Sequence, residues 1–163
     1  MATTTVSDSK SILFERRDQI VLLVHSADPP NNADWDEYVQ ALAKAARNGA
    51  TGLLVLTDGV GPDSTQRKMI SDIKLRTAVV TLSRMARGIV TALGWLGANI
   101  RAFAPDQMDE ALDSLGVPAA DREAVSRRLA AMRLEVAGKS AAAMAVAEIQ
   151  EVLNSSLATL AQR

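Results

Sequence analysis

The sequence predicts an α/β fold: a mainly parallel five-stranded sheet in the order β-β-α-β-α-β-α-β-α, with a C-terminal helical extension. Three observations lead to this prediction. The apolar residues recur with a period that switches repeatedly between strand-like and helix-like values. The connections between these segments are short, which implies right-handed crossovers and parallel strands. From Pro118 onward strand-like runs cease, and the chain is rich in Ala, Leu, Glu and Arg.

These patterns divide the 163 residues into three parts. Residues 1–10 are predicted to be a flexible N-terminal tail, 11–117 the α/β domain and 118–163 the helical extension. The start of the chain is polar and has no apolar segment, so no signal peptide is expected.

A hairpin is the first predicted element. Its strands are residues 11–16 and 19–24, and residues 17–18 form the tight turn between them. The first strand mixes polar and apolar residues, as an edge strand does. The second is almost wholly apolar, as expected for a strand covered on both faces. Residues 28–32 include two prolines and must form a loop.

The first helix is expected to begin near Asp34, with Glu37 completing a capping box, and to stop at Asn48-Gly49. Residues 52–56 form the third strand. Helical spacing predicts the buried side of this helix: Trp35, Tyr38, Val39, Leu42 and Ala46.

A loop over residues 58–67 follows the third strand and leads into a short helix, about 63–73. Residues 75–81 form the fourth strand. Ser83 is then expected to cap a helix that runs to Leu96. Its predicted buried face is Met85, Ile89, Ala92, Leu93 and Leu96.

Four further residues of the first and third helices carry structural expectations. Trp35 and Trp95 are expected to be buried, because large aromatic side chains usually are. Gly88 and Gly94 cost about 1 kcal/mol each relative to alanine within a helix, which suggests close backbone packing or the approach of a ligand.

The α/β domain is predicted to end with one more strand and helix. Residues 100–104 form the fifth strand, Asp106 caps a helix over 107–115, and Gly116 ends it.

Two amphipathic segments follow, with Gly138 between them, so the extension is predicted to be a helix–hinge–helix or one bent helix. Their apolar stripes are Val125, Leu129, Met132 and Val136, and then Val146, Ile149, Leu153, Leu157 and Leu160. Each stripe needs a covering surface. That surface is the α/β core, the other helix or a second subunit, and the last would make a homo-oligomer through residues 119–162.

Composition excludes several classes of function. With 18 basic and 19 acidic residues, the chain has no electrostatic footprint for nucleic acid. It has no cysteine, which excludes disulfides and a thiolate nucleophile. Its one histidine and scattered carboxylates show no metal-ligand spacing, and no cofactor is predicted. No apolar stretch approaches the roughly 20 residues of a membrane span, so a cytoplasmic protein is expected.

The stretch from Asp58 to Arg67 is the predicted binding or switch loop, because a strand that ends in a Gly-rich turn and opens a capped helix gathers backbone N–H groups. Its candidate residues are Asp58, Gly59, Gly61, Asp63, Ser64, Gln66 and Arg67. The loop is neither a P-loop nor a dinucleotide fingerprint, and Pro62 removes one donor.

Four other residues are candidate anion contacts at the same edge of the sheet: His25, Ser83, Arg84 and Arg87. With Arg67 they could clamp a carboxylate or phosphate. The alternative is that the arginines form surface ion pairs of little energetic weight. His25, Ser26, Asp58 and Ser64 also suggest a hydrolase triad, but no Gly-x-Ser-x-Gly elbow surrounds a serine.

The element order resembles the STAS fold of anti-sigma-factor antagonists, and more closely the bacterial STAS/SEC14-like, or SpoIIAA-like, proteins. The resemblance covers roughly residues 11–116. It is carried by residues 34–38, 58–67, 87–95 and 100–106. It implies a protein-interaction switch or a small-ligand or lipid-binding module, rather than an enzyme with a defined site.

The antagonists carry an Asp-Ser pair at a helix start after the third strand, where the serine is phosphorylated. Asp63-Ser64 lies in a comparable place, although Thr65-Gln66-Arg67 replaces the small residues that follow in the antagonists. The alternative is that Asp63 is only a helix cap and Ser64 a solvated residue.

Three functions therefore remain open. The first is a non-enzymatic regulatory module that binds a protein partner or a small or lipid-like ligand. The second is an anion-binding enzyme or ligand sensor that uses His25, Asp58, Arg67 and Arg87. The third is a structural protein that forms oligomers through its helical extension.

Overall fold

The computed structural model describes residues 11–26, 29–59, 61–95 and 97–161, and it confirms the predicted α/β class. The predicted N-terminal tail lies outside these residues. One five-stranded sheet has the sequential order β1-β2-β3-β4-β5. The pair β1–β2 is antiparallel and the other three pairs are parallel. The strands are β1 (Ile12–Arg17), β2 (Ile20–His25), β3 (Gly52–Leu56), β4 (Arg76–Val80) and β5 (Ile100–Phe103).

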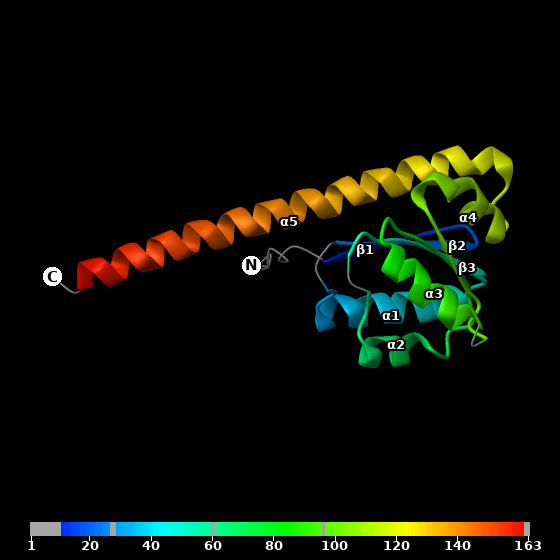
Figure 1. The fold of residues 1–163 in the computed structure, drawn as a ribbon, viewed down its shortest axis with the longest axis horizontal. Helices are drawn as coiled ribbons and strands as arrows, with labels where there is room; N and C mark the ends of the chain where they lie inside the picture. Colours follow the sequence, from blue (N-terminus) through cyan, green and yellow to red (C-terminus); the bar gives the residue numbers. More distant parts are fainter. Residues whose placement is uncertain (1–10, 27–28, 60, 96, 162–163) are drawn as a thin grey trace, which may run out of the picture.

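Helices cover both faces of this sheet (Figure 1). They are α1 (Asn32–Arg47), α2 (Ser64–Ile70), α3 (Arg84–Trp95), the 3₁₀ turn η1 (Pro105–Gln107), α4 (Met108–Ser114) and α5 (Ala119–Ala161). One hydrophobic cluster joins the sheet to α1, α2 and α3, and the other joins it to α4 and the first half of α5. None of the helices in these ranges has the length and apolar content that a membrane crossing requires.

The sheet is buried on both sides because its strand residues alternate between the two clusters. Leu22 and Leu54 face α4 and α5, whereas Val21 and Leu53 face α1. All six residues of β2 are buried, as its apolar sequence predicts.

The hairpin turn lies one residue later than predicted. Arg17 pairs with Ile20, so Asp18 and Gln19 form the turn, and Asp18 has a φ of 50°. Aspartate tolerates the left-handed conformation that a two-residue hairpin demands, which explains the position of the turn.

Two predicted helix caps are confirmed and two are wrong. Asp63 caps α2, and Ser83 Oγ accepts a hydrogen bond from the backbone N–H of Ala86 at 3.1 Å. The N-cap of α1 is Asn31 rather than Asp34, since the Asn31 side chain accepts from the N–H of Asp34 at 2.8 Å. Asp106 lies inside η1 and caps nothing, because the chain enters α4 through this 3₁₀ turn.

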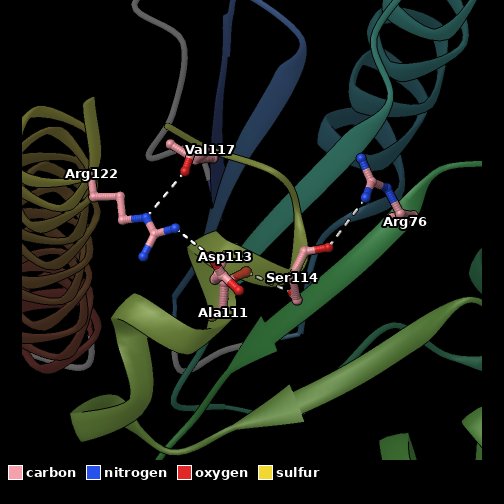
Figure 2. A network of polar contacts seen from close by, with 6 residues as sticks. All are labelled: Arg76, Ala111, Asp113, Ser114, Val117 and Arg122. Atoms are coloured by element: carbon pink, nitrogen blue, oxygen red, sulfur yellow. Dashed lines mark hydrogen bonds and ion pairs between the residues drawn. The ribbon is translucent and has the colours of Figure 1, made fainter. Parts of the chain in front are cut away.

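The junction between α4 and α5 is held by two arginines (Figure 2). Arg122 of α5 donates to the carbonyl of Val117 at 3.1 Å and forms an ion pair with Asp113 of α4. Arg76 of β4 donates to the carbonyls of Ser114 and Leu115, at 3.5 and 3.3 Å. Arg76 thereby satisfies carbonyls at the C-terminal end of α4 that have no partner within the helix, and Arg122 bonds the loop that follows. The direction in which α5 leaves the domain is thereby fixed.

The helical extension is one continuous helix of 43 residues, so the predicted hinge at Gly138 is wrong. A single glycine costs about 1 kcal/mol in a helix interior, which is too little to break a helix with strong helix formers on both sides. The first predicted stripe is buried on the sheet: Val125, Leu129, Met132 and Val136. The covering surface of the first stripe is therefore the α/β core, one of the three alternatives.

The second half of α5, residues 137–161, projects past the sheet as an arm (Figure 1). Contacts along the helix give its direction. Arg17, at the end of β1, donates to the carbonyl of Ala124, and Arg133 pairs with Asp58 after β3. The helix therefore runs from the amino ends of β2–β4 to their carboxyl ends. Val146, Ile149 and Leu153 of the second stripe are exposed. The side chains of Leu157 and Leu160 lie outside the described part.

Candidate functional site

The predicted site residues lie where parallel strands end. His25 is the last residue of β2, Asp58 follows β3, and Ser83 follows β4. The carboxyl ends of β2, β3 and β4 meet at one edge of the sheet, which we call the carboxyl edge. Ligands of open α/β sheets commonly bind at such an edge.

The predicted loop ends in a complete capping box. Asp63 accepts a hydrogen bond from the N–H of Gln66 at 2.8 Å, and the Gln66 side chain accepts from the N–H of Asp63 at 3.1 Å. Ser64 is exposed at the first position of α2. Asp63 therefore has the structural role that its residue type favours, and phosphorylation of Ser64 stays a prediction.

Gln66, a predicted binding residue, is buried and joins three segments. Its side-chain NH₂ group donates to the carbonyl of Pro30 at 3.0 Å. Its backbone carbonyl accepts from the indole N–H of Trp35 at 3.1 Å. These bonds tie the start of α2 to α1 and to the loop before α1.

Asp58 forms an ion pair with Arg133 of α5. This contact could not be predicted from the sequence, because 75 residues separate the partners and no local pattern links them. The pair fastens the start of the predicted loop to the helix that becomes the arm.

His25 is buried beside Trp35, with the two ring centroids 6.2 Å apart. Burial lowers the pKa of His25 to about 4, so the imidazole is neutral at physiological pH. Its Nδ1 and the hydroxyl of Tyr38 are buried without a hydrogen-bond partner in the described structure. The hydroxyl proton of Tyr38 is held more tightly, because burial raises the pKa of that group.

Two of the predicted anion-binding arginines hydrogen-bond to the loops beside them. Arg87 donates to the carbonyls of Thr81 and Leu82, at 2.8 and 3.4 Å, and Arg67 donates to the carbonyl of Pro62 at 2.9 Å. Arg84 is exposed. Each guanidinium has five N–H donors, so these bonds leave donors over, and anion binding stays a prediction.

Two open hollows lie away from the predicted loop. One lies on the arm, and the other is formed by β5, α4 and Arg122. Within the described ranges, no three metal-ligating side chains gather in one place.

The most unusual surface of the described chain is the outer side of α3. Its predicted buried face is wrong: Met85 and Ala92 are exposed, Leu93 is half-buried, and Leu96 lies outside the described residues. Trp95 is 85% exposed, also against prediction, whereas Trp35 is buried as predicted. We call the following residues, between 54% and 85% exposed, the α3 face: Leu82, Met85, Ile89 and Trp95.

The opposite side of α3 packs on the sheet. Val90 contacts the cluster beneath α1 and α2, and a Cβ atom on Gly94 would lie 3.0 Å from the carbonyl oxygen of Ile100. The close-packing prediction therefore holds for Gly94. It fails for Gly88, where an added Cβ would meet nothing within 4 Å.

A signal for the α3 face was present in the sequence. Only Arg84, Arg87 and Thr91 are polar among the twelve residues of α3. A surface helix normally has an apolar stripe on one side and polar residues opposite. An apolar arc this wide exceeds what one sheet face can cover, so part of it must face solvent or a partner.

Comparisons with known proteins bear on the fold alone. No family model and no curated protein matches the sequence. A similar solved structure is that of an uncharacterized DUF3478-family protein with a SpoIIAA-like fold from Shewanella loihica. It has 13% sequence identity and a TM-score of 0.47, over 68% of this chain and 98% of that one.

Proposed function

We propose that this chain is a non-enzymatic recognition module that binds a protein partner through the α3 face. The observation that carries the proposal is the exposure of four large apolar side chains, three on α3 and Leu82 on the segment that leads into it. At about 200 Å² for a complete side chain, they expose roughly 500 Å² of apolar surface. Patches of that size on a soluble domain usually mark interaction sites.

The charges of α3 indicate the chemistry of the partner. Its charged residues are two arginines, Arg84 at its first position and Arg87 one turn later. A partner that fits would insert an apolar segment flanked by acidic residues. Tryptophan and arginine are enriched among the residues that dominate binding energy at interfaces.

The structural roles of the polar groups at the carboxyl edge support a function without catalysis. His25 is buried and neutral, Asp58 is paired with Arg133, and Asp63 caps α2. Asp58 and Asp63 are thus engaged in contacts within the fold, and His25 is buried away from solvent, which leaves recognition as the better-supported use of this domain. Its cytoplasmic location stays a prediction from the sequence.

A pair of matched double variants tests the proposal. Met85→Glu/Ile89→Glu places two charges on the α3 face, whereas Gln40→Glu/Gln150→Glu adds the same charge at exposed polar positions away from α3. Each protein is used to capture partners from the native cell extract, and the captured protein is then purified and titrated. We expect binding to fall at least tenfold for the first variant and to stay unchanged for the second.

A loss of binding in the control variant but not in Met85→Glu/Ile89→Glu would refute the proposal. Equal binding by the wild type and both variants would also refute it, because the partner would then bind elsewhere. Trp95 fluorescence that shifts with lipid vesicles, but not with any captured protein, would indicate a lipid surface instead.

A further inference from the structure

Helix α5 carries a row of exposed apolar and small residues along the side opposite its docked face, and this row differs from the two stripes predicted from the sequence. Its large members, Leu134, Ile149 and Val152, are between 60% and 74% exposed. Three small residues on the same side are also exposed: Ala131, which precedes Leu134, and Gly138 and Ala145, which lie between Leu134 and Ile149. We call these six residues the outer stripe. At about 100° per residue, Leu134 projects about 200° from the buried Val136, away from the sheet.

The outer stripe is symmetric about the midpoint between Ala141 and Ala142. When a second copy lies antiparallel, the symmetry sets Leu134 opposite Ile149, Gly138 opposite Ala145, and Ala131 opposite Val152. The small residues meet near the centre, where they permit close approach of the backbones, and the largest pair lies farther out. A two-fold dimer requires one surface that complements itself, and this stripe does so.

The hollow on the arm fits this pairing. It is lined by Ala145, Glu148, Ile149, Val152 and Leu153. The first four are spaced i, i+3, i+4 and i+7, which is the four-residue hole that receives a side chain in coiled-coil packing. In the antiparallel pairing, Leu134 of the second copy lies directly over this hole.

Charge and domain placement are also compatible with the pairing. None of the six stripe residues is charged, and antiparallel helix dipoles attract. Each α/β domain is docked on the side of α5 opposite the stripe. The two domains therefore lie on opposite sides of the helix pair and do not collide.

We infer that two copies of this chain associate through the outer stripes of α5 as an antiparallel pair. The stripe covers residues 131–152, or about 33 Å of helix. A strip of that length and about 10 Å wide covers roughly 330 Å² per copy, which is smaller than a standard specific interface and corresponds to a weak one. The dimer is therefore reversible and depends on concentration. It uses a different surface from the α3 face, so the two proposals can fail separately.

Sedimentation equilibrium of the full chain tests the inference. The average mass of the wild type is expected to rise with concentration toward twice the monomer mass. Leu134→Glu/Ile149→Glu should remain monomeric, with an unchanged circular dichroism spectrum for the α/β domain. Gln150→Glu/Asn154→Glu adds equal charge off the stripe and should dimerise like the wild type.

Cysteine cross-linking tests the orientation without relying on loss of binding, and the cysteine-free chain makes single-cysteine variants unambiguous. A mixture of Leu134→Cys and Ile149→Cys proteins should cross-link, whereas each variant alone should not. Cross-linking of each variant alone would indicate a parallel pair and overturn the inference. A wild type that stays monomeric would also overturn the inference. The same holds for a dimer that persists in Leu134→Glu/Ile149→Glu but is lost in Met85→Glu/Ile89→Glu.

Discussion

Acidification to pH 4.5 should destabilise this protein through His25. The ring is buried against Trp35, and burial lowers its pKa from 6.5 to about 4. Between these values the unfolded chain binds a proton that the folded protein excludes. The contribution of the neutral His25 ring to the free energy of unfolding is therefore fully present above about pH 6.5 and is lost as the pH falls toward 4. The difference of 2.5 pKa units corresponds to about 3 kcal/mol in full, of which roughly 2 kcal/mol is lost between pH 7 and 4.5.

Urea unfolding at a fixed protein concentration measures this loss, with the fluorescence of Trp35 as a probe beside the ring. His25→Gln removes the titrating group, and the carboxylates that also respond to acid are the same in both proteins. The wild type should lose roughly 2 kcal/mol more than the variant between pH 7 and 4.5. Equal losses in the two proteins would refute the assignment of a buried, neutral imidazole.

Three smaller predictions concern single side chains. Gly88→Ala should raise the free energy of unfolding by up to about 1 kcal/mol, because an added Cβ meets open space. Gly94→Ala should lower the free energy of unfolding, because an added Cβ crowds the carbonyl oxygen of Ile100 in β5. Thermal unfolding of the two variants gives the sign of each change. Asp63→Ala should cost about 1 kcal/mol through the lost cap, and Ser64→Ala much less, as measured by urea unfolding. Acrylamide should quench Trp95 strongly in the free protein, and protection without a partner would show that the α3 face is already covered.

The sheet could be predicted from sequence because each strand carries its own signal. An apolar run such as that of β2 requires cover on both faces, and short connections leave few topologies. The α3 face was harder to predict. Met85 and Val90 are both apolar at helical spacing, and the periodicity of the helix does not say which of them meets the sheet.

Two other features depend on contacts that no local pattern contains. The N-cap of α1 is Asn31 because the Asp34 carboxylate is used elsewhere: it accepts from the backbone N–H and the hydroxyl of Ser11, at 2.8 and 3.1 Å. The ion pair between Asp58 and Arg133 forms only when α5 crosses the sheet. Within the candidate site, the Asp63 cap was predictable because capping depends on neighbouring residues alone.

Photo-cross-linking within the native cell tests the recognition proposal most directly. A photoreactive amino acid is placed at Met85 on the α3 face, and in a matched control at Gln40, which is exposed on α1. We expect a discrete adduct with a second protein species from position 85 and none from position 40. The same adducts from both positions, or none from position 85, would contradict the proposal.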